Sequence, residues 1–446
     1  MNELTELSYA LDTFYFLICG VLVMWMAAGF SMLEAGMVRS KNTAEILTKN
    51  IALFAIACTM YLLVGYYIMY SSGEGGFLPS LGFLIGAENS VDAVLAGGED
   101  APYYSMRSDF FFQVVFVATA MSIVSGAVAE RMKLWAFLAF AVVMTAFIYP
   151  VSGYWTWGGG WLDGVGYSDY AGSGIVHMAG AAAALAGVLV LGPRKGKYGK
   201  DGSIHAIPGA NMPLATLGTF ILWMGWFGFN GGSELKMSDA VSANNVAQVF
   251  VNTNAAAAGG VIAALVLAKL WFRKADLTMA LNGALAGLVA ITADPLSPSA
   301  LGASVIGAIG GLIVVAAIVT LDKLTRELAD NAELYEMSKE EGDEAGLLTI
   351  EAEADKLRPL IEELEFRRMF SNPADPLMAR LEACGLDASI DGIGNVLGRH
   401  RGPGPGKGGG SRAGAPGPGD PGTGRPEPGP GPRQAGLRRM VRRLPC

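Results

Sequence analysis

Long apolar runs alternate with short polar connections from the N-terminus to about residue 322. A transmembrane helix needs about 20 consecutive apolar residues to cross the hydrocarbon core of a bilayer. Glycine and alanine are dense within the runs, which is typical of helices that pack closely in lipid. The pattern predicts an all-α integral membrane protein, a tight bundle of about nine transmembrane helices. These helices are expected over residues 13–35, 50–71, 110–129, 134–155, 173–192, 212–230, 244–270, 276–293 and 300–321.

The chain changes character near Leu324, where the apolar runs end. The stretch that follows, residues 326–370, is charged and rich in residues that favour helices. From about residue 401 the chain consists mainly of glycine, proline and arginine, a composition that cannot bury enough apolar surface to fold. We therefore predict a membrane domain, a charged helical segment, a short further fragment and a disordered tail. Their boundaries are expected at residues 1–324, 325–376, 377–402 and 403–446.

Composition and charge narrow the range of functions. Hydrophobic residues make up 52% of the chain and charged residues 16%, which is high and low respectively for a soluble protein. The net charge of −8 does not suggest a nucleic-acid partner. The four cysteines show neither metal-ligand spacing nor a disulfide framework. We expect no metal site, no cofactor and no enzymatic activity.

Basic residues in the connections predict the orientation of the bundle. They gather in alternate connections, whereas the other connections carry mostly acidic residues. Because short loops rich in Lys and Arg stay in the cytoplasm, we expect the N-terminus outside and the end of the ninth span inside. The first residues lack the basic region of a signal peptide, so no cleaved leader is expected there. The basic residues are Arg39, Lys41, Arg131, Lys133, Arg194, Lys195, Lys197, Lys200, Lys269, Arg273 and Lys274.

His177 is the one histidine of three that lies inside a long apolar run. An ionisable side chain in hydrocarbon is costly, so its presence by default marks a pathway or a relay. A charged imidazolium is strongly disfavoured in such surroundings, whereas a neutral ring can exchange one hydrogen bond with a small uncharged molecule. A simple helix–helix hydrogen bond is the alternative interpretation of this histidine.

Aromatic and hydroxyl side chains gather near the outer ends of several spans. Phe116 lies in the third span, Trp157 precedes the fifth, and Phe229 and Ser233 close the sixth. Aromatic faces together with one hydroxyl can hold a small cation and replace part of its hydration shell. The pattern therefore favours a small, hydrogen-bonding cation over an anion or a sugar.

Each of these residues also has a purely structural interpretation. Trp157 can belong to the aromatic belt at the membrane interface, and Phe116 and Phe229 can be packing residues. Asp169 can cap the fifth span at its N-terminus. Glu34 can pair with a neighbouring helix. Spacing alone leaves these alternatives open.

Five motifs in order resemble those of the ammonium transporter family, the group of ammonium transporters, methylammonium permeases and Rhesus proteins. The resemblance covers residues 10–324. One departure is mild: the family usually has Gly-Gly where this chain has Gly172-Ser173. The motifs occupy residues 28–42, 126–131, 157–160, 169–177 and 225–233.

The resemblance implies roles for individual residues. Phe116, Trp157 and Ser233 match the family's outer ammonium-recruitment site, and Phe116 and Phe229 match the stacked pair that gates the pore. Asp169 matches the aspartate that stabilises the outer site. His177 matches the first of two hydrogen-bonded pore histidines.

The resemblance further implies a transport cycle and partners. Ammonium is expected to be selected outside and deprotonated, and ammonia to cross the apolar pore. A homotrimer in the inner membrane, in contact with lipid, is expected. Regulation by a PII-type protein at the cytoplasmic face is a further family expectation.

The chain departs from the family after Leu321–Leu324. The family has eleven spans, built as two inverted halves and a final helix, and its second pore histidine lies on the tenth. No tenth apolar run follows here, and neither His205 nor His400 is placed to stand in. Transport is therefore expected to be impaired.

The residues beyond the membrane domain resemble fragments of other families. Residues 328–371 are similar to the N-terminal helical part of peptide chain release factor 2, but the Gly-Gly-Gln motif needed for peptide release is absent. Residues 379–399 are similar to a segment of M20-type amidohydrolases without the metal-binding motif. The alternative hypothesis is a non-functional fusion product of three partial genes. A soluble activity carried by residues 325–446 is the third hypothesis.

Overall fold

The computed structural model describes residues 2–341, apart from 71, 72, 74, 97–100, 200–202, 204 and 206, together with 386–390 and 396–400. Beyond Leu321 it describes the course of the helix and strands but not the side chains. Most of the predicted charged segment, most of the amidohydrolase-like fragment and the predicted disordered tail lie outside the described residues.

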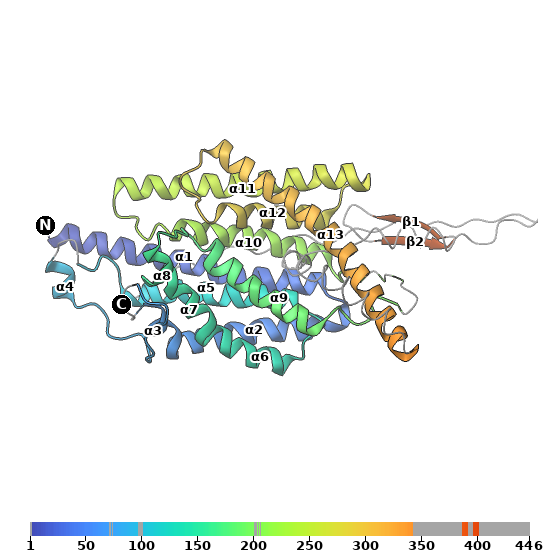
Figure 1. The fold of residues 1–446 in the computed structure, drawn as a ribbon. Helices are drawn as coiled ribbons and strands as arrows, with labels where there is room; N and C mark the ends of the chain where they lie inside the picture. The colour runs from blue at the N-terminus through green and yellow to red at the C-terminus, as the bar shows by residue number, and fades with distance from the viewer. Residues whose placement is uncertain are drawn as a thin grey trace, which may run out of the picture. The chain divides into compact units, whose positions relative to one another are not determined.

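The membrane domain is a bundle of helices, as the apolar runs predict (Figure 1). Three of the membrane-crossing segments contain a wide π turn: η2 (Tyr61–Gly65), η3 (Met144–Ile148) and η4 (Ser173–Met178). The α-helices are α1 (Asn2–Met37), α2 (Thr43–Met60), α3 (Tyr66–Tyr70), α4 (Val91–Ala96), α5 (Met106–Ala127), α6 (Leu134–Val143), α7 (Tyr149–Thr156), α8 (Trp161–Gly164), α9 (Ala179–Leu191), α10 (Met212–Gly232), α11 (Ala240–Phe272), α12 (Leu277–Ile291) and α13 (Ala300–Glu341), with a short 3-10 turn η1 (Ser40–Asn42).

Eight of the nine predicted spans are confirmed as helical segments long and apolar enough to cross a membrane within the described residues. The ninth, predicted over 276–293, is the shorter apolar helix α12 of 15 residues. Large apolar side chains such as Trp135 and Val190 are exposed on the outside of the bundle. Such faces suit contact with lipid rather than water.

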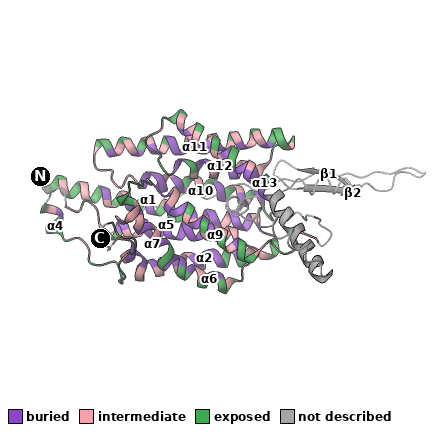
Figure 2. Cartoon of the chain, viewed as in Figure 1, coloured by how far each residue is buried: buried purple, intermediate pink, exposed green. Residues whose placement is uncertain are grey.

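Helix α5 lies inside the bundle, and its residues are almost all buried (Figure 2). Helix α1 runs beside α10, and small residues allow the two backbones to approach closely: a Cβ atom at Gly218 would lie 2.5 Å from Leu33 N. On the other side, α11, α12 and α13 pack together, and a side chain at Gly307 would collide with Ala256 O. The glycine-rich packing expected from the sequence is confirmed at these interfaces.

A buried ion pair joins α1 to α2 inside the bundle. Glu34 Oε2 lies 3.7 Å from Lys49 Nζ, and both side chains are buried. Ser125 of α5 donates its hydroxyl to the same carboxylate oxygen at 2.7 Å, and Lys49 donates to the Ser125 carbonyl at 2.7 Å. The interpretation that Glu34 pairs with a neighbouring helix is confirmed. Removing one partner of such a pair leaves a buried charge without compensation, which is strongly destabilising.

Glu130 joins two of the sequence motifs at one end of the bundle. Its carboxylate accepts hydrogen bonds from Arg39 N and Nε and from Asn42 Nδ2, and Arg194 lies 3.4 Å away. Burial opposes ionisation, but the hydrogen bonds from Arg39 and Asn42 outweigh it and lower the pKa of Glu130. The motifs at 28–42 and 126–131 are therefore held together by one carboxylate.

Two short strands lie outside the membrane domain and were not predicted from the sequence. β1 (Leu386–Ile390) pairs antiparallel with β2 (Val396–His400), and Ala388 faces Gly398. Both strands fall within residues 377–402, the short fragment predicted before the tail.

Replacing Glu130 with glutamine is expected to lower the free energy of unfolding by about 1.5–3 kcal/mol, the usual worth of hydrogen bonds to a charged group. Glu45→Gln is the matched control, because Glu45 is exposed on α2. Unfolding in detergent measures both. Because the folded-state pKa of Glu130 is lowered, its contribution is present above its ordinary value of 4.5 and is lost as the pH falls through the folded-state pKa. An acid-stability slope unchanged in Glu130→Gln would contradict this role.

Candidate functional site

Three of the predicted site residues line one cavity. Phe116 of α5, Trp157 after α7 and Ser233 after α10 surround a space of about 390 Å³, here called the aromatic cavity. Ser233 donates its hydroxyl hydrogen to the Phe229 carbonyl at 2.9 Å, so the lone pairs of its oxygen remain available to accept. The other lining residues are Tyr66, Tyr70, Tyr104, Asp109, Phe112, Gln113, Tyr170 and Leu235.

Two tyrosines at the edge of the aromatic cavity stay neutral. Burial raises the pKa of Tyr104 and that of Tyr170. Tyr170 also donates its hydroxyl to Glu234 at 2.5 Å, which raises its pKa further. These groups are therefore hydroxyl donors and acceptors rather than phenolates.

Phe116, which lines the aromatic cavity, is stacked on a second phenylalanine, Phe229. The rings of Phe116 and Phe229 lie 4.1 Å apart between centroids at 24°, and both side chains are fully buried. Trp157 meets Phe116 edge-on, with centroids 6.1 Å apart. Phe229 thus contacts Phe116 with its ring on one side and His177 on another.

His177 lies directly behind Phe229. Its imidazole is stacked on the Trp226 indole at 5.0 Å and 19°, and Phe229 contacts it edge-on at 5.4 Å. Nδ1 lies 3.1 Å from the Gly172 carbonyl oxygen. A carbonyl can only accept, so Nδ1 carries the hydrogen in this bond and Nε2 of the neutral ring is left as an acceptor.

The π turn that carries His177 is set by Gly172. The Gly172 carbonyl accepts from both Val176 N and His177 N at 3.0 Å, so the turn contains one residue more than an α-turn. Gly172 itself has φ of 105°, and a Cβ atom there would lie 2.7 Å from Val176 Cγ2. Only glycine fits this position without strain.

Asp169 fixes that turn from its N-terminal side. The buried carboxylate accepts four backbone hydrogen bonds, from the N–H groups of residues 172, 173, 174 and 175 at 2.8–3.0 Å. Its backbone carbonyl accepts from Trp157 Nε1 at 2.8 Å. Asp169 therefore caps the span, as one interpretation of the sequence held, and through its carbonyl it also holds the tryptophan of the aromatic cavity.

Ser173, the mild departure from the family motif, has a structural partner of its own. Its hydroxyl donates to the Val289 carbonyl of α12 at 2.8 Å. A glycine at this position lacks that bond, so the serine adds a tie between η4 and the second half of the bundle.

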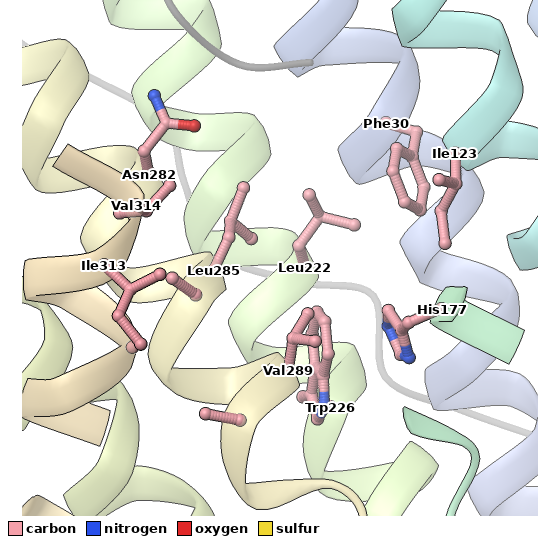
Figure 3. A pocket seen from close by; sticks show the side chains of 13 residues that line it. Phe30, Ile123, His177, Leu222, Trp226, Asn282, Leu285, Val289, Ile313 and Val314 are labelled. Atoms are coloured by element: carbon pink, nitrogen blue, oxygen red, sulfur yellow. The ribbon is translucent and has the colours of Figure 1, made fainter. Parts of the chain in front are cut away.

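A second cavity of about 290 Å³, here called the histidine cavity, lies on the other side of His177. Figure 3 shows His177 at one side and Ile313 and Val314 of α13 at the other, with Leu222 and Trp226 between them. Its lining is almost entirely apolar. The further lining residues are Phe30, Ile123, Asn282, Leu285, Ala286, Val289, Ala290 and Gly310.

Trp226 is a site residue that the sequence reasoning missed. Its indole N–H donates to Thr292 Oγ1 at 2.7 Å, which holds the ring flat against the imidazole. The sequence does contain a signal for this role. Trp226 lies three residues before Phe229 and therefore on the same face of α10. It also lies within the span rather than at the membrane interface.

The remaining histidines do not reach the site. His205 is exposed and contacts Ser203 and the Gly196 carbonyl. His400 ends β2, and its side chain is not described. Within the described part of the chain, no group of three His, Cys, Asp or Glu side chains is arranged to hold a metal ion.

The sequence profile of the Ammonium Transporter Family matches residues 14–330. The chain belongs to this family. It is 44% identical over 312 residues to ammonium transporter Amt2 of Archaeoglobus fulgidus, covering 68% of this chain and 63% of that protein. It is 42% identical to the putative ammonium transporter sll1017 of Synechocystis, covering 72% of each chain. The chain thus spans less than two thirds of the length of the Archaeoglobus relative.

Solved structures of ammonium transporter family proteins share the fold. A sensor Amt protein matches with a TM-score of 0.64 at 30% identity, covering 82% of this chain and 91% of that one. Saccharomyces cerevisiae Mep2 matches with a TM-score of 0.57 at 25% identity, covering 68% and 67%. This member of the ammonium transporter family is a multi-pass membrane protein with the helical fold of these structures.

Asp169→Ala is expected to lower the free energy of unfolding by at least about 2 kcal/mol, because four backbone N–H groups lose a charged acceptor. Asp239→Ala is the matched control: Asp239 caps α11 with bonds to two N–H groups and is partly exposed, so a smaller loss is expected. Thermal unfolding in detergent measures both. Equal losses in the two variants would contradict the special position of Asp169.

Proposed function

We propose that this chain transports ammonium, moving it as ammonia through an apolar pore. The observation that carries the proposal is the order of groups along one line: the aromatic cavity, the stacked Phe116–Phe229 pair, His177 and the histidine cavity. Aromatic faces attract a cation, whereas an apolar passage favours a neutral molecule. Ammonium that gives one proton to water on the side of the aromatic cavity, and then passes the phenylalanine pair as ammonia, satisfies both parts.

The aromatic cavity supplies the chemistry for recruitment. The faces of Phe116 and Trp157 attract a cation by about 0.5–2 kcal/mol each. The Ser233 oxygen accepts one N–H, since its own hydrogen is bonded to the Phe229 carbonyl. A cation that loses part of its hydration shell in the aromatic cavity lies next to the Phe116–Phe229 pair.

The imidazole of His177 supports passage of the neutral molecule. With Nδ1 bonded to Gly172, Nε2 is an acceptor for an N–H of ammonia. We infer that the chain is oriented with the N-terminus and the aromatic cavity outside the inner membrane, as the distribution of basic residues favours. A homotrimer, and a PII-type regulator on the cytoplasmic face, remain family expectations for this chain.

Impairment is the second part of the proposal. His177 is the one imidazole among the residues that line the histidine cavity, and the opposite side is formed by apolar residues of α13. Among the described residues that line this cavity, ammonia that leaves His177 therefore meets no second imidazole. The loss of one hydrogen bond is worth about 1–1.5 kcal/mol, or about a tenfold change in rate.

Uptake of radiolabelled methylammonium by transporter-deficient cells tests the proposal. We expect measurable uptake, at least about tenfold slower than that of Archaeoglobus Amt2 at equal expression. Trp157→Ala is expected to abolish it, whereas Trp135→Ala, an exposed tryptophan on α6, is the matched control that retains it. Uptake as fast as the relative would disprove impairment, and uptake that does not depend on Trp157 would disprove the recruitment site.

One observation favours a second candidate, a non-functional fusion product. The family match ends at residue 330, whereas the chain continues to 446. We infer that the release-factor-like and amidohydrolase-like stretches, at about 326–376 and 377–402, are fragments joined to a transporter that ends early. The absence of any membrane-inserted oligomer on native gels would favour this candidate, and resequencing the locus across Leu324 tests the junction itself.

A further inference from the structure

Asp109 shares one face of α5 with the residues of the recruitment site. It lies in the first turn of the helix, and Phe112, Gln113 and Phe116 follow at spacings of three, four and seven. All four line the aromatic cavity. None of the sequence motifs contains Asp109. Its carboxylate nevertheless lies on the wall of the aromatic cavity, two helical turns from Phe116.

The Asp109 carboxylate is buried but has few hydrogen-bond donors. Asp12 is also buried, and its carboxylate accepts from Met237 N, Ser238 N and Ser238 Oγ at 2.7–2.8 Å. Asp169 accepts four backbone N–H groups. Asp109, with 6% of its surface exposed, accepts the Tyr66 hydroxyl at 2.6 Å and has Gln113 beside it. Among the described residues, no Lys or Arg forms an ion pair with it.

Gln113 supplies an independent indication of a ligand. Its side-chain oxygen Oε1 is buried and has no hydrogen-bond partner, although Gln113 lines the same cavity. Buried polar atoms are nearly always hydrogen-bonded, so an orphaned acceptor on a cavity wall calls for an explanation. A bound donor inside the cavity provides one.

We propose that Asp109 and Gln113 form an anionic subsite in the aromatic cavity, which binds ammonium or a small alkylammonium ion before it reaches the Phe116–Phe229 pair. The inference rests on the proposed function. It adds a negatively charged carboxylate to the proposed recruitment site. An ammonium ion has four N–H donors, and the subsite offers carboxylate and amide oxygens that the aromatic faces lack. Neutral ammonia gains much less from the carboxylate, so the subsite selects the charged form.

A structural role for Asp109 predicts a different pattern of effects. If the carboxylate only ties α5 to α3 through Tyr66, then asparagine, which keeps an acceptor oxygen, preserves most of that tie. Tyr66→Phe removes the tie but leaves the charge in the cavity. The two substitutions therefore separate charge from attachment.

Equilibrium binding of radiolabelled methylammonium to the purified full chain in detergent tests the proposal. We expect Asp109→Asn to weaken binding by at least about tenfold, in line with the strength of charge-assisted bonds, with little change in melting temperature. Tyr66→Phe is expected to lower the melting temperature but to weaken binding less. Asp163→Asn removes an exposed carboxylate from the connection after α7 and is the control for general surface charge; its binding is expected to stay within about twofold.

The outcomes of this experiment distinguish the anionic subsite from the proposed transport function. If Trp157→Ala weakens binding and Asp109→Asn does not, the recruitment site stands and the anionic subsite is wrong. If Asp109→Asn weakens binding no more than Tyr66→Phe, or only together with a fall in melting temperature, Asp109 has a structural role instead. If the unmodified chain binds no methylammonium at all, both the subsite and the proposed function are overturned.

Discussion

The carboxylate of Asp169 and the four backbone N–H groups that it accepts are the interaction on which the candidate pore depends. A span that begins inside a membrane protein has N–H groups that water cannot satisfy, and a charged acceptor satisfies them at one point. The same residue binds the Trp157 indole through its carbonyl. The position of Trp157 in the proposed recruitment site and the orientation of the imidazole therefore both depend on one anchored turn.

The pore region combines two environments that favour different forms of one molecule. The aromatic cavity presents ring faces, hydroxyl groups and the Asp109 carboxylate, whereas the histidine cavity is almost wholly apolar. The proposed boundary between them is the pair of phenylalanine rings at Phe116 and Phe229, 4.1 Å apart. Such a boundary disfavours a charged ion and leaves a neutral molecule with one partner behind it, His177. The account of transport rests on this contrast rather than on any single residue.

Much of this arrangement could be predicted from the sequence, and the exceptions have physical causes. Apolar run length predicts the spans, but α12, with 15 residues, is shorter than the usual span, and most of its residues are buried inside the bundle. The π turn at Ser173–Met178 depends on the backbone of Gly172, which no periodicity reveals. Asp109 is recognised only when the fold brings it to the wall of the aromatic cavity, whereas the helical spacing of Trp226 and Phe229 could be read from the sequence. The strands at 386–390 and 396–400 lie in a stretch for which a resemblance had indicated only a fragment.

The central claim is that the turn anchored by Asp169 presents His177 to the pore as a hydrogen-bond acceptor. Nitrogen NMR of the histidine-labelled full chain in lipid tests it most directly, because the chain has three histidines and the signals of His205 and His400 can be removed by substitution. The account predicts a His177 ring with its hydrogen on Nδ1 and an open Nε2, and loss of that state in Asp169→Ala. A ring with its hydrogen on Nε2 and a bare Nδ1, or a signal indifferent to Asp169, would contradict it.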